Sequence, residues 1–263
     1  MKYIIYALLF LGIAACTSVP ITGRKQLTFI PNDQILSLSK QSYRDVLKDS
    51  KLSTNELQVQ RLRKIGNRIS SAVEQYLKSV GREDLIKGYV WEFNLIESDQ
   101  LNAWAMPGGK VAFYTGILPV CKNDDGIAVV MSHEIAHAIA QHGNERMSQQ
   151  QIQQGSALVL DAAMMNKSPE TRALAMTAFG LGSQVGIMLP YSRKHESEAD
   201  ELGLYFMALA GYNLQEAPKF WERMAATGGG APPELLSTHP SHSTRIKNME
   251  KNIPKAEAFA KKQ

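Results

Sequence analysis

The chain has 263 residues, of which 44% are hydrophobic and 21% are charged, and its formal net charge is +4. This composition is that of a globular protein with one sizeable core or two small ones. The basic excess is small and contains no run of like charges and no basic-aromatic stripe, which excludes an electrostatic nucleic-acid footprint.

The first fifteen residues are predicted to be a signal peptide. Met1 and Lys2 give a positive start, and the apolar stretch 3–15 is too short to span a membrane. Small residues followed by Cys16 resemble the lipobox of bacterial lipoproteins, which implies cleavage before Cys16 and its acylation. An ordinary secretory signal is the alternative. Because Thr17 in the second mature position matches outer-membrane sorting, we expect a lipid-anchored protein of the bacterial envelope that faces the periplasm.

Residues 16–30 are predicted to form a tether and residues 31–263 a single domain. Helices, a small group of strands and further helices follow one another, an order that indicates an α+β fold. Ser53 and Glu56 fit a capping box for the second helix. The helices are expected over 31–50, 56–79, 124–147, 192–210, 213–226 and after 241, and the strands over 89–97, 103–106 and 110–115.

Two features outside these elements have less direct interpretations. Residues 151–190 are rich in Ala, Gly, Met and Leu, and we interpret them as core helices. A mobile lid is the alternative, because glycine loosens helices. Cys121 lies in an apolar segment and is expected to be a small buried hydrophobe. With Cys16 acylated, Cys121 has no partner for an internal disulfide.

The sequence His133-Glu134-Ile135-Ala136-His137 lies within a predicted helix and carries the strongest functional signal. Residues four positions apart lie above one another on a helix, so both imidazoles can bind one ion at about 2.0–2.1 Å. Glu134 then lies beside the ion, where a base can take a proton from metal-bound water. Two incidental, hydrogen-bonded histidines are the alternative, but an apolar helix has little reason to carry them.

A catalytic zinc ion needs a third protein ligand, and a later acidic segment supplies the candidates. Glu196 and Asp200 share one face of a predicted helix, so Glu196 can bind the ion while Asp200 accepts the spare N–H of a ligand histidine. Spacing alone does not choose between Glu196 and Glu198. An iron site with two histidines and a carboxylate is a weaker alternative, since it needs no glutamate beside the first histidine.

Taken together, the motif His-Glu-x-x-His at 133–137 and the motif Glu-x-x-Ala-Asp at 196–200 resemble peptidase family M48. The resemblance implies a mainly helical α+β, zincin-like metallopeptidase domain of the gluzincin type, with a small sheet whose edge strand borders the active-site cleft. It also implies one zinc ion per chain, with Glu196 as the third ligand and Asp200 as the residue that orients a histidine.

Two further segments carry the same resemblance. Residues 102–109 are similar to the family's active-site edge strand, and Thr238-His239-Pro240 with Arg245 is similar to its late motif. His239 is then expected near the zinc ion, where it either stabilises the oxyanion or blocks the fourth ligand position in a latent state. No membrane-length span and no repeat array follows Cys16, so we expect a minimal single-domain member. The expected edge-strand residues are Asn102, Ala103, Trp104, Ala105 and Met106.

These inferences predict a zinc-dependent metalloendopeptidase with Glu134 as general base, acting on unfolded or misassembled envelope proteins. Pairing with an edge strand recognises the backbone of the partner, which favours extended polypeptides as partners. The alternatives are a latent or non-catalytic lipoprotein that acts as a chaperone or binding module on the same fold, and a structural zinc protein, against which Glu134 argues. The oligomeric state stays open.

The other histidines are expected to lie away from the metal. His142 follows His137 by five residues, which places it about 140° round a continuous helix and off the ligand face. His195 and His242 are expected to be surface or packing residues.

Overall fold

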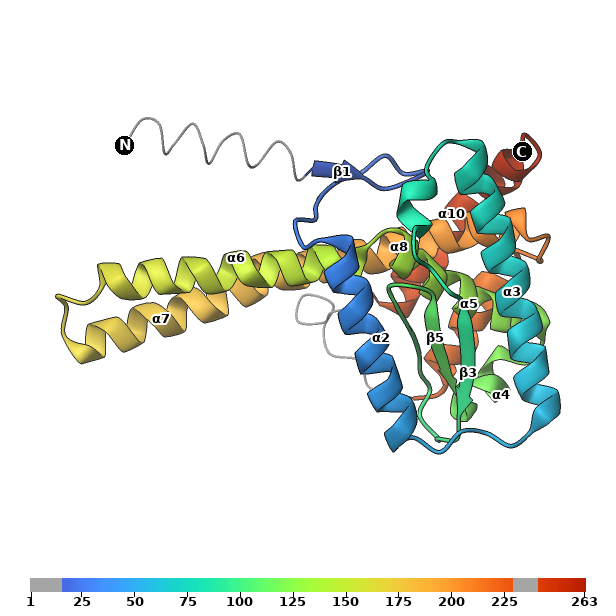
Figure 1. Ribbon diagram of the computed structural model, residues 1–263, viewed down its shortest axis with the longest axis horizontal. Helices are drawn as coiled ribbons and strands as arrows, with labels where there is room; N and C mark the ends of the chain where they lie inside the picture. The colour runs from blue at the N-terminus through green and yellow to red at the C-terminus, as the bar shows by residue number, and fades with distance from the viewer. Residues whose placement is uncertain (1–15, 229–240) are drawn as a thin grey trace.

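The computed structural model describes residues 16–228 and 241–263 and confirms a mainly helical α+β fold (Figure 1). The helices are α2 (Asn32–Asp49), α3 (Glu56–Ser79), α4 (Leu118–Cys121), α5 (Asp124–Ile139), α6 (His142–Ala163), α7 (Pro169–Ser183), α8 (Leu189–Leu209), α9 (Glu216–Ala226) and α10 (His242–Ala260). The strands are β1 (Cys16–Ser18), β2 (Lys25–Leu27), β3 (Glu92–Ile96), β4 (Ala103–Met106) and β5 (Lys110–Tyr114). Short helical turns are η1 (Glu83–Ile86), η2 (Thr115–Ile117) and the π-helical η3 (Gln184–Met188).

The long helix α3 packs one apolar stripe against β3 and α5. Leu62, Ile69 and Val73 recur at helical spacing and are fully buried. Burial of each such side chain contributes roughly 1.5–3 kcal/mol, so this stripe fixes the helix on the core. The predicted capping box is wrong: Asn55 is the N-cap, and its side chain accepts a hydrogen bond from the backbone N–H of Gln58.

The central sheet has the strand order β3-β5-β4, in which β3 is parallel to β5 and β4 is antiparallel to it. The antiparallel pair follows from the tight turn at Gly108 and Gly109, whose φ angles of 86° and 80° suit glycine. β5 therefore occupies the middle, with Phe113 buried, and within residues 16–228 and 241–263 one edge of β4 has no strand partner.

The stretch that was expected to be a tether contains two paired strands. Cys16 lies opposite Leu27 in the antiparallel pair of β1 and β2. Val19 and Gln26 in this stretch leave only 1% and 3% of their surfaces exposed. These residues therefore pack on the domain, and the expectation of a tether over 16–30 is corrected here. The predicted signal peptide, residues 1–15, lies outside the described residues.

The helix expected over 124–147 ends at Ile139, and a new helix begins at His142. Gln141 has a φ angle of 54°, in the left-handed region, so the backbone turns sharply between α5 and α6. His142 therefore does not lie where a continuous helix would place it.

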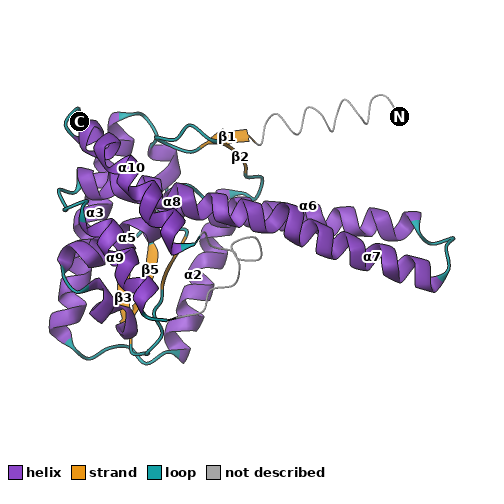
Figure 2. Cartoon of the chain, turned by 180° about the vertical axis from the view of Figure 1, so that it is seen from behind, coloured by secondary structure: helices purple, strands orange, loops and turns teal. Residues whose placement is uncertain are grey.

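Residues 151–190 form neither core helices nor a lid over the cleft. They belong to α6, α7, η3 and the start of α8. α6 lies beside α7, and this pair of helices projects away from the domain (Figures 1 and 2). All forty of these residues are described, and none of them lines the large cleft of the domain. We call residues 147–192 the arm.

Candidate metal centre

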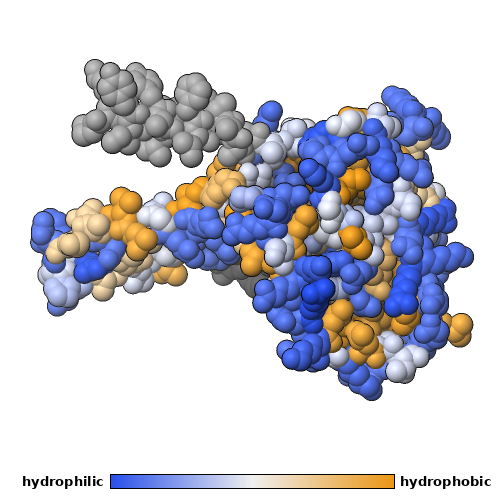
Figure 3. Space-filling view, in the orientation of Figure 1, coloured by the Kyte–Doolittle hydropathy of each residue, from blue (hydrophilic) through white to orange (hydrophobic). Residues whose placement is uncertain are grey.

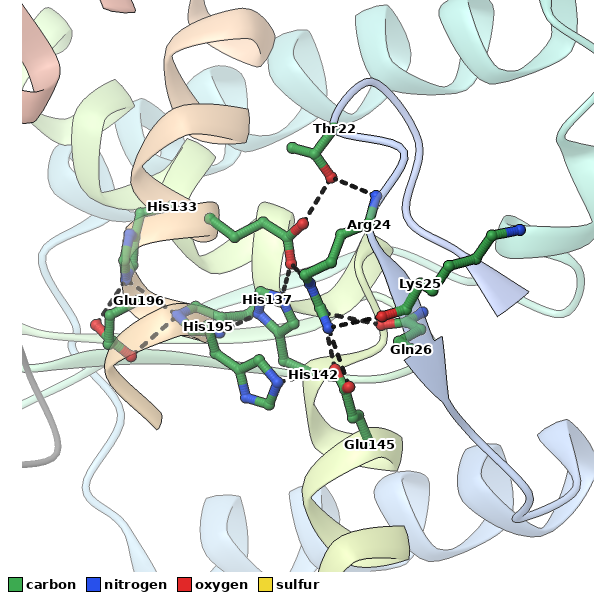
Figure 4. Close-up of polar contacts among 11 residues, drawn as sticks. Thr22, Arg24, Lys25, Gln26, His133, His137, His142, Glu145, His195 and Glu196 are labelled. Atoms are coloured by element: carbon green, nitrogen blue, oxygen red, sulfur yellow. Dashed lines mark hydrogen bonds and ion pairs between the residues drawn. The ribbon is translucent and has the colours of Figure 1, made fainter. Parts of the chain in front are cut away.

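Two buried helices bring three potential metal ligands together. α5 supplies His133 and His137, α8 supplies Glu196, and the two helices pack directly against each other. The Nε2 atoms of His133 and His137 are 3.1 Å apart. The carboxylate of Glu196 lies 3.4 Å from Nε2 of His133 and 3.3 Å from Nε2 of His137 (Figure 4). The three ligand atoms therefore face one point, as predicted for Glu196 rather than Glu198.

These distances fit a tetrahedral zinc ion. With ligand bonds of about 2.0–2.1 Å, two ligand atoms of a tetrahedral zinc ion lie about 3.3 Å apart. The two Nε2 atoms lie 3.1 Å apart, Oε2 of Glu196 lies 3.4 Å from His133, and Oε1 of Glu196 lies 3.3 Å from His137. Two imidazole nitrogens and one carboxylate oxygen are also the donor set of catalytic zinc sites that keep a position open. The residues present therefore fit zinc without rearrangement.

Asp200 and Arg245 hold the first ligand histidine in place. Nδ1 of His133 lies 3.0 Å from Asp200, so the histidine carries its proton on Nδ1 and keeps a lone pair on Nε2. Arg245 donates two hydrogen bonds to Asp200, at 2.7 and 2.5 Å, and its guanidinium lies 3.4 Å from the ring centre of Trp221. Asp200 and Arg245 thus lie where the sequence predicted them.

The second ligand histidine is held through another histidine, which the sequence analysis placed off the ligand face. Nδ1 of His142 lies 2.9 Å from Nδ1 of His137, and Nε2 of His142 lies 2.9 Å from Glu198. His137 therefore donates from Nδ1 to His142, which donates from Nε2 to Glu198. Burial lowers the pKa of His142 well below its ordinary value, so this ring is neutral and able to accept.

A half-buried arginine, Arg24, lies between the N-terminal strands and connects this series of contacts to a second one (Figure 4). Arg24, between β1 and β2, donates to Glu198 at 2.7 Å and to both oxygens of Glu145 at 3.0 and 2.8 Å. His195 lies 2.8 Å from Glu145 and stacks on His142 with ring centres 4.3 Å apart. Although burial raises the pKa of Glu145, hydrogen bonds with His195 and Arg24 lower it to about 2.

Sequence reasoning missed these residues because their signals are weak. His195 was expected to be a surface or packing residue, and it is buried. Glu198 was expected to be either a metal ligand or a solvated surface charge, and it is buried without being a ligand. The polar run Gln141-His142-Gly143-Asn144 marks a helix break that a strictly periodic interpretation overrides. Arg24 carries no motif and is recognised only because the fold places it between two buried carboxylates.

Glu134 lies beside the three ligands in a cleft of about 890 Å³, which they also line. Burial raises the pKa of its carboxyl group to about 7, although the charge of His133 opposes this shift. The backbone of Ala105 lowers this pKa, so the Ala105 peptide group faces Glu134. This carboxylate is therefore directed at the space between the metal ligands and β4, where a general base is needed.

The edge strand β4 borders this cleft. Asn102, Ala103, Trp104 and Ala105 line it, whereas Met106 does not. The peptide groups of a strand alternate in direction. Because the N–H of Ala105 faces Glu134, the peptide groups of Ala103 and Ala105 both lie on the free edge of β4. Two residues thus present backbone donors and acceptors to the cleft.

Three other predicted residues have different outcomes. His239 lies outside the described residues, so its place near the metal stays a prediction. His242 lines the cleft and stacks on Trp221 with ring centres 5.5 Å apart, as a packing residue. Cys121 is fully buried and burial raises its thiol pKa to about 12, which makes it a core residue and no nucleophile.

Comparisons with known proteins agree with this geometry. A family model described as peptidase family M48 matches residues 64–253. The mitochondrial metalloendopeptidase OMA1 of Saccharomyces cerevisiae is 34% identical over 246 residues, which cover 90% of this chain and 69% of that protein. The mitochondrial OMA1 of Homo sapiens is 28% identical over 244 residues, covering 90% of this chain and 46% of that protein. The β-barrel assembly-enhancing protease of Escherichia coli is 31% identical over 166 residues, covering 59% of this chain and 33% of that protein.

Proposed function

The chain belongs to peptidase family M48, and on that premise we propose that it is a zinc-dependent metalloendopeptidase that cleaves extended polypeptides. One observation carries the proposal. The imidazole Nε2 atoms of His133 and His137 lie 3.1 Å apart and 3.3–3.4 Å from the two carboxylate oxygens of Glu196, and the half-buried carboxylate of Glu134 lines the same open cleft. A structural zinc site has no use for either the cleft or this second carboxylate.

The residues of the cleft divide the chemical work. When bound, the zinc ion supplies Lewis acidity that lowers the pKa of a water ligand and polarises the peptide carbonyl. Glu134 takes the proton of the attacking water and delivers it to the leaving amine. A carboxyl pKa raised to about 7 by burial suits this exchange near neutral pH. Asp200 and His142 keep the ligand histidines in the tautomer that presents Nε2.

Substrates bind as an added strand on β4 in this proposal. The outward peptide groups of Ala103 and Ala105 pair with the backbone of an extended segment, and the alternating side chains fall into the cleft or towards solvent. Such pairing needs an unfolded or incompletely assembled substrate. Similarity to the Escherichia coli β-barrel assembly-enhancing protease supports clients of the bacterial envelope.

Anchoring at Cys16 completes the proposal. The small residues before Cys16 suit acylation, and Thr17 suits delivery to the outer membrane. A Cys16→Ser variant is expected to lose metabolic labelling with palmitate and to leave the membrane fraction. Retained labelling would place the acyl group on another residue.

The peptidase is tested with unfolded casein and the variant Glu134→Gln. Zinc content, measured by mass spectrometry, is expected to remain at one ion per chain, because the three ligands are intact. Cleavage is expected to fall by at least about 100-fold, the contribution of a general base. The variant His133→Ala is expected to lose both zinc and cleavage. Full cleavage by Glu134→Gln would remove Glu134 from this role and favour the non-catalytic binding module.

A further inference from the structure

The arm is built from two helices that leave the domain together. α6 and α7 pack along each other, and η3 returns the chain to α8 (Figures 1 and 2). Gln153 and Ser183 bond across the pair at 2.6 Å, and Arg172 bonds to Asp161 at 2.6 Å near the far end. The arm therefore holds itself together while the rest of its surface faces outward.

That surface carries large apolar side chains that none of the described residues covers. Leu158, Val159 and Leu174 each leave 72% of their surfaces exposed. Single exposed apolar residues are ordinary, but a continuous series marks an interaction site. Figure 3 shows apolar side chains along much of the arm, in contrast to the largely polar face of the domain. Further exposed apolar residues of the arm are Ile152, Met165, Leu181, Val185, Ile187 and Tyr191.

Charges are missing from most of the arm. Residues 147–160 and 173–192, which are 14 and 20 residues long, contain no Asp, Glu, Lys or Arg. The four charged residues between these stretches lie near the far end, and two of them neutralise each other in the Arg172–Asp161 pair. Such a composition suits contact with hydrocarbon, where an unpaired charge is costly.

The arm suits the surface of a bilayer better than its centre. The continuous helix 169–209 contains a stretch long and apolar enough to cross a membrane, which corrects the expectation that no membrane-length span follows Cys16, and only 11% of that stretch is buried in the molecule. α6, however, presents exposed glutamines at 150, 151 and 154 beside its apolar residues. A helical pair whose exposed surface mixes apolar and uncharged polar side chains suits the interface between lipid headgroups and acyl chains.

The base of the arm meets the strand that carries the proposed anchor. An apolar pocket of about 420 Å³ lies between β2 and the arm, and Leu27, Phe179 and Ile187 are among its lining residues. Leu27 is the register partner of Cys16. A membrane anchor at Cys16 thus holds the arm within reach of the same bilayer and raises the effective concentration of lipid around it.

We propose that the arm is a membrane-contacting element, which lies in the interface of a phospholipid bilayer with its apolar side chains among the acyl chains. The occupant is lipid rather than a second copy of the chain, because the uncovered apolar residues lie on both helices and next to the anchoring strand. This inference rests on the anchoring at Cys16 proposed above. It adds a second membrane contact to the lipid and orients the domain relative to the bilayer.

The test uses the full chain in vesicles of phosphatidylethanolamine and phosphatidylglycerol with brominated acyl chains. Bromine quenches indole fluorescence only at close range, so one exposed leucine of the arm is replaced in the variant Leu158→Trp. An interfacial apolar face lies about 5–10 Å into the headgroup and acyl boundary, and the added emission is expected to fall by about half. The matched control Leu57→Trp replaces an exposed leucine of α3, outside the arm, and is expected to be quenched much less.

Each result decides a separate point. Equal quenching of the two variants, or none at Leu158→Trp, overturns the arm as a lipid contact, whether water or a second copy covers it. Leu174→Trp on α7 repeats the measurement if Leu158→Trp does not fold. Leu158→Trp protein that floats with vesicles without quenching leaves the anchor standing and removes the arm. Cleavage of casein by the protein bound to the same vesicles tests the peptidase independently, because none of these substitutions lies in the cleft.

Discussion

Each ligand histidine is held by a carboxylate, but by a different route. His133 bonds directly to Asp200, at 3.0 Å. His137 bonds to His142, and that ring passes the interaction on to Glu198. Because a hydrogen-bonded carboxylate fixes the tautomer of a ligand imidazole and raises its basicity, both routes favour zinc binding. The longer route has one more residue that can be altered without removing a ligand.

Removal of that intermediate ring is expected to weaken zinc binding. In His142→Ala, His137 loses its Nδ1 acceptor and Glu198 loses a donor while all three ligands remain. Zinc affinity, measured by chelator competition, is expected to fall about 10–100-fold. Gln154→Ala, an exposed change further along α6, is the control and is expected to leave affinity unchanged. Wild-type affinity in His142→Ala would show that His137 needs no orienting partner.

The pH dependence of cleavage is expected to follow Glu134. Burial raises the pKa of this carboxyl to about 7, and the base acts only when it is deprotonated. Activity is therefore present above that pKa and is lost as the pH falls through it. The positive charge of a bound ion moves the pKa downwards. The acid limb of kcat/KM is expected between about pH 5 and 7, and a flat profile across that range would contradict the assignment.

At the scale of elements, the two ligand helices approach each other at a glycine. A Cβ atom on Gly203 of α8 would lie 3.3 Å from the backbone nitrogen of His133 on α5. That contact is tighter than ordinary van der Waals packing. The absence of a side chain here lets α8 bring Glu196 to the ligand histidines.

Enlarging that glycine is expected to separate the ligands. Gly203→Val places two methyl groups between α5 and α8 and is expected to destabilise the fold by about 1–3 kcal/mol, with weaker zinc binding. Gly155→Ala on the arm is the matched control: its Cβ meets nothing within 4 Å, so it is expected to stabilise α6 by roughly 0.5–1 kcal/mol. Denaturant unfolding measures both changes. Equal effects of the two variants would contradict the close approach.

The elements differ in how far the sequence predicted them. The bounds of β4 were predicted to the residue. α3 and α5 were predicted because their apolar residues recur at helical spacing or follow one another in the sequence. The bend at Gln141 was missed, because a single left-handed residue does not change the apolar periodicity around it. The expected tether was wrong for a different reason: Arg24 is half-buried through partners at positions 145 and 198, which no local pattern reveals.

The candidate site shows the same division. The ligands His133, His137 and Glu196 were predicted, the histidines by spacing and the glutamate by family resemblance. The groups that orient them come from sequence-distant contacts and were found only in part. Residues 151–190 were misinterpreted because apolar composition predicts burial, whereas these helices leave the domain with their apolar side chains uncovered.

At the scale of the whole molecule, the metal is expected to stabilise the fold. A cation offsets the negative charge that the fold gathers around α5 and α8, and binding to the folded state alone stabilises it by about 4 kcal/mol at a free zinc concentration 1,000 times Kd. The buried carboxylates are Glu145, Glu196, Glu198 and Asp200, and the arginines beside them are Arg24 and Arg245.

Removal of zinc with a chelator is therefore expected to lower Tm by roughly 10 °C for a chain of this size. Calorimetry with and without chelator measures the shift. Glu134→Gln keeps all ligands and is expected to shift as the wild type does, whereas His133→Ala is expected to show no shift. A wild-type Tm that ignores the chelator would mean that the metal contributes nothing to folding.

The free edge of β4 sets a timing rule for clients. Only Ala103 and Ala105 turn peptide groups outward, so the grip on any captured segment is short and tolerant of sequence. Such pairing holds a segment only until that segment pairs with strands of its own protein. A client that completes its structure quickly hides its strands before they are caught, and one that stalls stays in reach. In the proposed binding mode, the lifetime of the unfinished state, more than amino-acid composition, is therefore expected to decide which chains are cleaved.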